Sequence, residues 1–219
     1  MNSIEFTGIS GAGKTIIADK LAQVFINNNF KVVRSIDAGY IRPFFYLLMH
    51  PSKIVLSLSF FIKYVRKINK ESTHFLKRWL MVQARMELLK RIDNKNIIIY
   101  DEGLIHVFRS FRRLTDNKFS IKYFWEHQTY NKLFRTLPDV IIYVTCNTEI
   151  VLERLSMRDG IISQDKIGQI LKQISNEQKT INDCNFYQSV SYKKFFKIDN
   201  SQELTEKIIY DLYINILST

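Results

Sequence analysis

A glycine-rich segment near the N-terminus, at residues 8–15, combines residue types that suit the binding of a phosphate group. Its glycines allow the backbone to pass close to a phosphate and to turn several N–H groups towards it. The lysine is placed to reach the β- and γ-phosphates of ATP, and the hydroxyl after it is placed to ligate Mg²⁺. The expected nucleotide-binding residues are Gly8, Ser10, Gly11, Ala12, Gly13, Lys14 and Thr15, of which Lys14 is also catalytic and Thr15 is also a metal ligand.

The elements on either side of this segment are the ones that its pattern, G-x-x-x-x-G-K-[ST], requires. The apolar run at residues 3–7 predicts a strand before it, and residues 14–27 predict a helix after it. The positive end of that helix favours an anion. A glycine-rich turn with an exposed lysine is the alternative, and the strand and helix argue against it.

Acidic residues that suit metal and acceptor chemistry follow two other apolar runs. Asp101 and Glu102 follow residues 96–100, and we expect Asp101 to hold Mg²⁺ directly or through water. Asp37 follows residues 31–36, where a carboxylate suits the orientation or deprotonation of a phosphoryl acceptor. Asp37 is the first candidate for this base and Glu102 the second, although an aspartate before Ala-Gly also suits a turn.

Two arginines, Arg154 and Arg158, are spaced to share one face of a predicted helix at residues 148–158. Two guanidinium groups aimed at a phosphoryl group in transfer would stabilise its spreading negative charge, so both are candidate catalytic residues. The same spacing is also common on a solvated helix face.

The remaining pattern predicts a single α/β domain over residues 1–219. Apolar runs at 139–145 and 194–198 also predict strands. With the runs at 3–7, 31–36 and 96–100, the sequence predicts five strands. Helical patterns lie between the strands, at 14–27, 73–92, 121–137, 148–158, 164–182 and 202–216. Strands that alternate with helices predict a parallel sheet covered on both faces, with ligands bound beyond the C-terminal ends of the strands.

Together these motifs resemble the P-loop small-molecule kinases of the thymidylate kinase, deoxynucleoside kinase and adenylate kinase-like group. The resemblance covers nearly the whole chain and implies a three-layer α/β/α fold with strand order 2-3-1-4-5. It implies a lid at about 154–165 and a helical acceptor-side region at about 38–93. It further implies that Asn200 and Ser201 lie near the base of ATP, and that Arg42, Gln83 and Arg85 bind the acceptor.

One departure from this group leaves the acceptor open. Asp101-Glu102-Gly103 replaces the acidic residue and arginine usual after the third strand, so a nucleotide or deoxynucleoside acceptor is not assured. The GTPase pattern Asn-Lys-x-Asp is absent from the sequence. We expect a kinase that transfers the γ-phosphate to a hydroxyl or phosphate of an anionic acceptor. The alternatives are a kinase for a polynucleotide, a modified base, or a glycan- or lipid-linked acceptor, and an ATP-dependent switch that transfers nothing.

The charge of the chain, +11, favours anionic partners, although a solvated basic surface is an equal explanation. Residues 51–93 contain ten Lys or Arg and three Asp or Glu around an apolar run at 54–62. This region suits the binding of a nucleic acid or a membrane surface, or simply a packed core.

We interpret Cys146 and Cys184 as reduced thiols, and the N-terminus leads directly into a predicted strand. We therefore expect a cytoplasmic protein, membrane-peripheral if the apolar run binds lipid; the oligomeric state is open, with a homodimer as one candidate.

Overall fold

The computed structural model describes residues 3–35, 41–64, 70–89, 96–101, 103, 105–107, 138–160, 162–176, 181–182, 185, 194–202 and 205–218. Three predicted features lie outside these residues: the acids Asp37 and Glu102, the thiol Cys184, and the helix at 121–137. Arg42 lies in a described helix, but its side chain is outside the described part.

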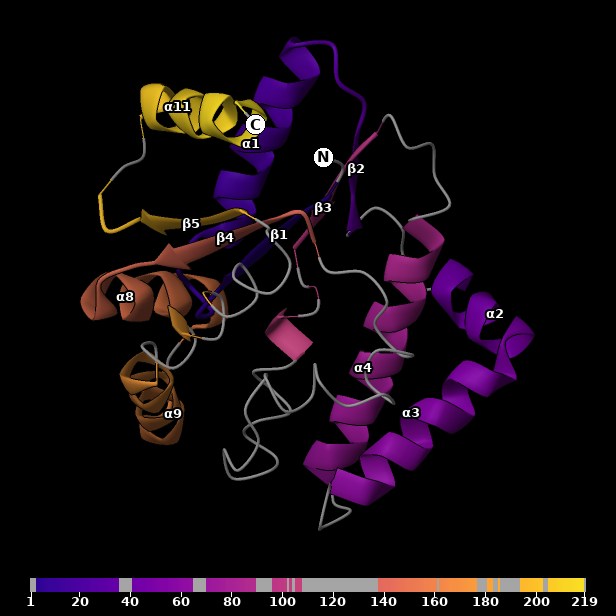
Figure 1. Ribbon diagram of the computed structural model, residues 1–219. Coiled ribbons are helices and arrows are strands. Elements are labelled where there is room, and N and C mark those ends of the chain that lie inside the picture. The colour runs from indigo at the N-terminus through magenta and orange to yellow at the C-terminus, as the bar shows by residue number, and fades with distance from the viewer. Residues whose placement is uncertain are drawn as a thin grey trace.

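The centre of the molecule is a parallel sheet of five strands in the order β2-β3-β1-β4-β5, as the resemblance implied (Figure 1). The strands are β1 (Ser3–Gly8), β2 (Val32–Arg34), β3 (Ile97–Tyr100), β4 (Val140–Thr145) and β5 (Lys194–Asp199). Every residue of β3 and β4 is buried. Burial on both faces explains why these two strands are nearly continuous Ile, Val and Tyr.

The register of the sheet brings the predicted site loops to one edge. Gly8, the last residue of β1, pairs with Val144 of β4, and Thr145 pairs with Asp199 at the end of β5. On the other side of β1, Glu5 pairs with Tyr100, the last residue of β3. The loops after β1, β3, β4 and β5 therefore leave the sheet at the same end, as parallel strands require.

Helices cover both faces of this sheet. Helices α1 and α11 pack together on one face, and α4 and α8 lie on the other (Figure 1). The described helices of at least nine residues are α1 (Lys14–Asn27), α2 (Ile41–Met49), α3 (Pro51–Tyr64), α4 (Lys70–Leu89), α8 (Thr148–Asp159), α9 (Gln164–Ser175) and α11 (Glu206–Leu217). The main core lies between the sheet, α1 and α11, and includes Phe6, Leu21, Phe25 and Tyr213.

Three predicted helix ends are wrong by three residues or more. The helix predicted over 73–92 already begins at Lys70. The helix predicted over 164–182 ends at Ser175, because the Asn176 side chain donates to Lys172 O at 2.8 Å and competes for a terminal carbonyl. The helix predicted from 202 begins at Glu206, because the preceding Thr205 is extended, with φ −68° and ψ 154°. Helix α1 spans 14–27 as predicted.

The helix at 51–64 that contains the apolar run is too short to cross a bilayer. Across the described part of the chain, no helix combines the length and the apolar character that a membrane span needs.

Candidate nucleotide-binding site

The loop between β1 and α1 leaves a helix N-terminus open to an anion. Gly13 is the N-cap of α1 and has φ +85°, a left-handed conformation that favours glycine. Within the described residues, no side chain caps this terminus, and the first turn of α1 contains no acidic residue. The first N–H groups of α1 therefore keep their capacity to bind phosphate, and the residues present fit a bound nucleotide phosphate.

Lys14 lies across this loop. Its Nζ donates to Gly8 O at 3.1 Å and to Ile9 O at 2.7 Å, so the ammonium is held on the loop by the loop's own carbonyl groups. Ser10 and Thr15 are exposed, and Ala12 is buried beneath the loop. The positive charge and the exposed hydroxyls thus lie in the segment where the sequence predicts the phosphates.

We call residues 8–15 the phosphate loop, after the role that the sequence predicts for them. Asn200, predicted to lie near the base of ATP, contacts this loop. Its side chain is 6% exposed, and Nδ2 donates to Ala12 O at 2.8 Å. A β-carbon on Gly13 would collide with the same Nδ2. Asn200 therefore fixes the main chain of the loop, and its contact also explains why residue 13 must be glycine. Ser201 lies beside it, where Oγ accepts from Asn147 N at 2.7 Å.

Replacing Asn200 by alanine is expected to loosen this loop. The change leaves Ala12 O without its buried donor, which should lower the free energy of unfolding by about 1–3 kcal/mol and weaken ATP binding. Urea unfolding and a titration with ATP measure the two effects. Asn176→Ala is the matched control, because it removes an amide-to-carbonyl contact of the same 2.8 Å length from an exposed helix end, away from this loop. An Asn200→Ala variant with unchanged stability and ATP affinity would contradict the role assigned to this side chain.

The two predicted lid arginines differ in their surroundings. Arg154 lies at the phosphate loop: Nη1 would be 3.4 Å from a β-carbon on Gly13, and Nη2 donates to Asn200 O at 3.3 Å. Its Nη1 also lies 3.4 Å from Sγ of Cys146, a free thiol whose pKa is raised by burial. The guanidinium of Arg154 is therefore within reach of a group bound over the loop.

Arg158 lies on the exposed end of α8, where its partner is the neighbouring Asp159. Its guanidinium makes a bidentate contact with Asp159, with Nε–Oδ1 at 2.7 Å and Nη2–Oδ2 at 3.0 Å. Lys166 of α9 binds the same carboxylate. Hydrogen bonds from Arg158 and then from Lys166 hold the pKa of Asp159 well below its usual range. Two nitrogens of the Arg158 guanidinium are therefore occupied by Asp159 in this structure.

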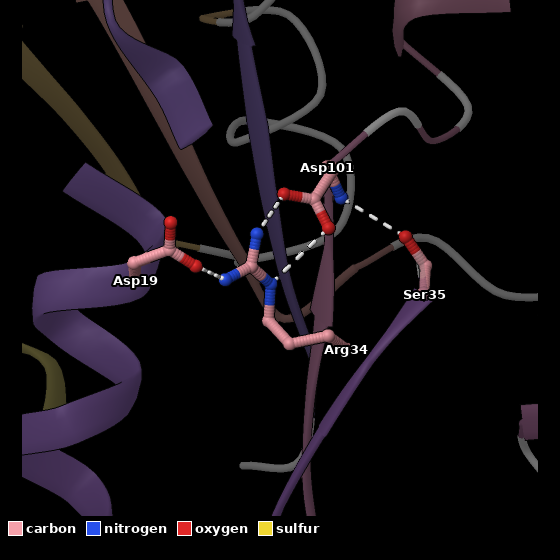
Figure 2. Close-up of polar contacts among 4 residues, drawn as sticks. All are labelled: Asp19, Arg34, Ser35 and Asp101. Atoms are coloured by element: carbon pink, nitrogen blue, oxygen red, sulfur yellow. Dashed lines mark hydrogen bonds and ion pairs between the residues drawn. The ribbon is translucent and has the colours of Figure 1, made fainter. Parts of the chain in front are cut away.

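Asp101 is bound by an arginine that the sequence interpretation missed (Figure 2). Arg34, the last residue of β2, donates from Nε to Asp101 Oδ2 at 3.2 Å and from Nη2 to Asp101 Oδ1. Its remaining nitrogen, Nη1, binds Asp19 of α1. The Ser35 hydroxyl accepts from Asp101 N at 3.1 Å. One guanidinium thus joins β2, β3 and α1.

This contact decides how Asp101 can act on a metal ion. Burial alone would lower the pKa of Arg34, but its hydrogen bonds and charge attraction to Asp101, then to Asp19, raise it, so the arginine stays charged. Both oxygens of Asp101 accept from this cation. Asp101 therefore does not fit direct ligation of Mg²⁺ in this arrangement, whereas the exposed Thr15 hydroxyl remains suitable.

A buried acid on β1, Glu5, was also missed. Glu5 is fully buried, and its Oε1 accepts from Ile105 N at 2.8 Å and from His106 N at 3.3 Å. A β-carbon on Gly103 would lie 2.5 Å from the Glu5 carboxyl carbon. The glycine of the unusual Asp101-Glu102-Gly103 segment is thus explained by the space that Glu5 occupies. A charged residue inside an apolar strand was the signal available in the sequence.

Of the two predicted acceptor-binding residues on α4, Gln83 is buried in a contact with α3. Gln83 is 3% exposed, and its Oε1 accepts from the Ser57 hydroxyl of α3 at 3.0 Å. Arg85 is half-buried on the same helix. Asp37 and Glu102 lie outside the described residues, as does the Arg42 side chain, so these three remain predictions.

Comparison with known proteins relates the chain to kinases through its fold. In sequence it matches no protein-family model and no curated protein. Three solved structures of deoxyadenosine kinase from M. mycoides share its fold. The one with dCMP and a flexible dCDP bound has a TM-score of 0.52 at 22% identity over 98% of each chain. The one with dATP has 0.52 at 21% over 100% of each, and the one with dCTP has 0.50 at 21% over 98% of each. The chain therefore shares the fold of these deoxyadenosine kinase structures.

Proposed function

We propose that this protein is an ATP-dependent phosphotransferase that moves the γ-phosphate of MgATP to a hydroxyl or phosphate of an anionic acceptor. The observation that carries the proposal is the set of cationic and N–H groups gathered around one loop. The open N-terminus of α1, the ammonium of Lys14 and the guanidinium of Arg154 all meet at residues 8–14. A fold shared with deoxyadenosine kinase supports the same reaction class.

Each residue around the phosphate loop would have its own role in the transfer. The N–H groups of the loop hold the phosphates, and Asn200 keeps the loop in the shape that this requires. Lys14 and Arg154 stabilise the charge that spreads over the transferring group, and Arg158 joins them after it leaves Asp159. Mg²⁺ supplies further neutralisation of the phosphate oxygens when bound, with Thr15 as its direct protein ligand and Asp101 as an indirect one through water.

The acceptor would bind on the side of α4, where Gln83 and Arg85 lie, with Arg42 near the start of α2. Asp37, or Glu102 as the second candidate, would orient and deprotonate the attacking hydroxyl. The deoxyadenosine kinase structures contain deoxynucleotides, which makes nucleosides and nucleotides the first acceptors to test. Glycan, lipid-linked and oligonucleotide acceptors follow, because Asp101-Glu102-Gly103 replaces the acidic residue and arginine usual after the third strand in the kinases that the sequence resembles. The reaction would take place in the cytoplasm, where MgATP is supplied.

A transfer assay tests this proposal. Protein, Mg²⁺ and γ-³²P-labelled ATP are incubated with separate panels of nucleosides, nucleotides, sugars, glycolipids and oligonucleotides. We expect label in one acceptor class with the wild-type protein and none above background with Lys14→Ala. Slow release of labelled phosphate with no labelled acceptor in any panel would contradict transfer and would indicate an ATP-dependent switch.

A further inference from the structure

Helices α2 and α3 expose a large apolar surface that the proposed reaction does not use. Seven large apolar side chains on these two helices are between 37% and 78% exposed. We define the α2–α3 apolar face by these residues: Phe44, Phe45, Leu48 and Met49 of α2, and Val55, Leu58 and Ile62 of α3. Isolated exposed apolar residues are ordinary, but a set of this size on adjacent helices indicates a binding surface.

The opposite sides of both helices are already packed against α4. Tyr46 and Leu47 of α2 form a buried cluster with Ala84 of α4. On α3, Phe61 stacks on Phe75 of α4, with ring centroids 6.4 Å apart. Figure 1 shows α2 and α3 side by side with α4 at the edge of the molecule. Because their buried side chains contact α4, the exposed α2–α3 apolar face points away from it. Its exposure follows from how these helices pack on α4.

The charges of these helices indicate what covers the face. Neither α2 nor α3 contains an aspartate or a glutamate, whereas together they contain Arg42, Lys53 and Lys63; Lys53 lies 3.8 Å from Glu87 of α4. Arg66 and Lys67 follow α3 directly in the sequence. A second copy docked through this face would bring two basic segments together, and neither segment carries a carboxylate of its own. An anionic lipid surface would accept both the apolar side chains and the basic ones.

We propose that the α2–α3 apolar face binds the surface of an anionic membrane, with α2 and α3 lying in the plane of the headgroups. The apolar side chains enter the boundary between headgroups and acyl chains, and the basic residues contact the acidic lipid headgroups. The protein thus associates with the membrane from one side, through helices that do not cross it. This inference does not depend on the proposed function, because the seven apolar residues that define the face have no role in the proposed reaction.

Co-sedimentation with vesicles tests this inference in the absence of nucleotide. The full-length protein is mixed with vesicles of phosphatidylcholine alone, or of phosphatidylcholine and phosphatidylserine in equal parts. We expect binding to the mixed vesicles, at least about tenfold weaker binding to the neutral ones, and release by high salt. Phe45→Glu and Ile62→Glu should each weaken binding to the mixed vesicles by on the order of tenfold or more. Both side chains are more than 60% exposed, so the variants should fold.

The matched control is Ile214→Glu on α11. Ile214 is 44% exposed, and α11 lies on the other face of the sheet from α4. This variant has the same change of charge and should bind as the wild-type protein does. Absence of binding to the mixed vesicles, or equal weakening by Ile214→Glu, would overturn the inference. So would a wild-type dimer, seen by light scattering without lipid, that Phe45→Glu and Ile62→Glu dissociate while vesicles bind none of the proteins. That result would identify the face as an interface between copies.

Discussion

Replacing Lys14 by alanine is expected to reduce the rate of phosphoryl transfer about 100- to 1000-fold, the usual cost of removing one preorganised charge from a transition state. Lys14 is the one ammonium that the described structure places on the phosphate loop, where its Nζ is held by Gly8 O and Ile9 O. Loss of these two contacts should lower the free energy of unfolding by only about 1 kcal/mol. The effect should therefore appear in kcat and far less in stability.

The control for this variant is Lys207→Ala, which removes the same charge from an exposed position on α11. It should leave both transfer and stability unchanged. The measurement is the initial rate of label transfer to whichever acceptor the panels identify, or of ATP turnover if none does. Retention of wild-type rates by Lys14→Ala would contradict the assignment of residues 8–15 as the site of transfer.

The phosphate loop was predictable because all of its information is local. The strand before it, the helix after it and the residues between them lie within 27 residues of the N-terminus. The other strands were predictable for a related reason, since β3 and β4 are buried on both faces and carry continuous apolar runs. The order of the strands came from the resemblance to P-loop kinases, because apolar runs do not indicate which strands are neighbours.

The contacts that hold the site together were not predictable, because they join residues distant in the sequence. Asn200 contacts Ala12 across 188 positions, and Arg34 contacts Asp101 across 67. A pattern of types and spacing places Asp101 at a strand end, but it cannot show that an arginine from the neighbouring strand occupies both carboxylate oxygens. Glu5 differs, since a carboxylate within an apolar run already implies a buried partner.

Replacing Arg34 by methionine is expected to lower the free energy of unfolding by about 3 kcal/mol, because the change leaves the Asp101 carboxylate buried without its cation. The side chains of Arg34 and Asp101 are only 10% and 14% exposed. Asp19 is 62% exposed and remains solvated, so the loss should come mainly from Asp101. Urea unfolding measures the change.

A double-mutant cycle with Asp101→Asn separates this contact from other effects of the substitution. The double variant should be more stable than Arg34→Met alone, because it no longer buries an unpaired carboxylate. Arg158→Met is the matched control: it removes an equally bidentate arginine–aspartate contact on an exposed surface, and should lower the stability far less than Arg34→Met does. Equal losses for Arg34→Met and Arg158→Met, or additive effects in the cycle, would contradict the role of Arg34.

The same variants distinguish the two ways in which Asp101 can serve catalysis. If Asp101 acts on Mg²⁺ only through water while Arg34 holds it, Asp101→Asn should change the Mg²⁺ concentration for half-maximal transfer by no more than a few-fold. A direct ligand would shift that concentration by more, because the amide loses the negative charge that a hard cation prefers. Since Arg34 binds both carboxylate oxygens, we expect the smaller shift together with a measurable loss of stability. A large shift with unchanged stability would mean that Asp101 leaves Arg34 when MgATP binds.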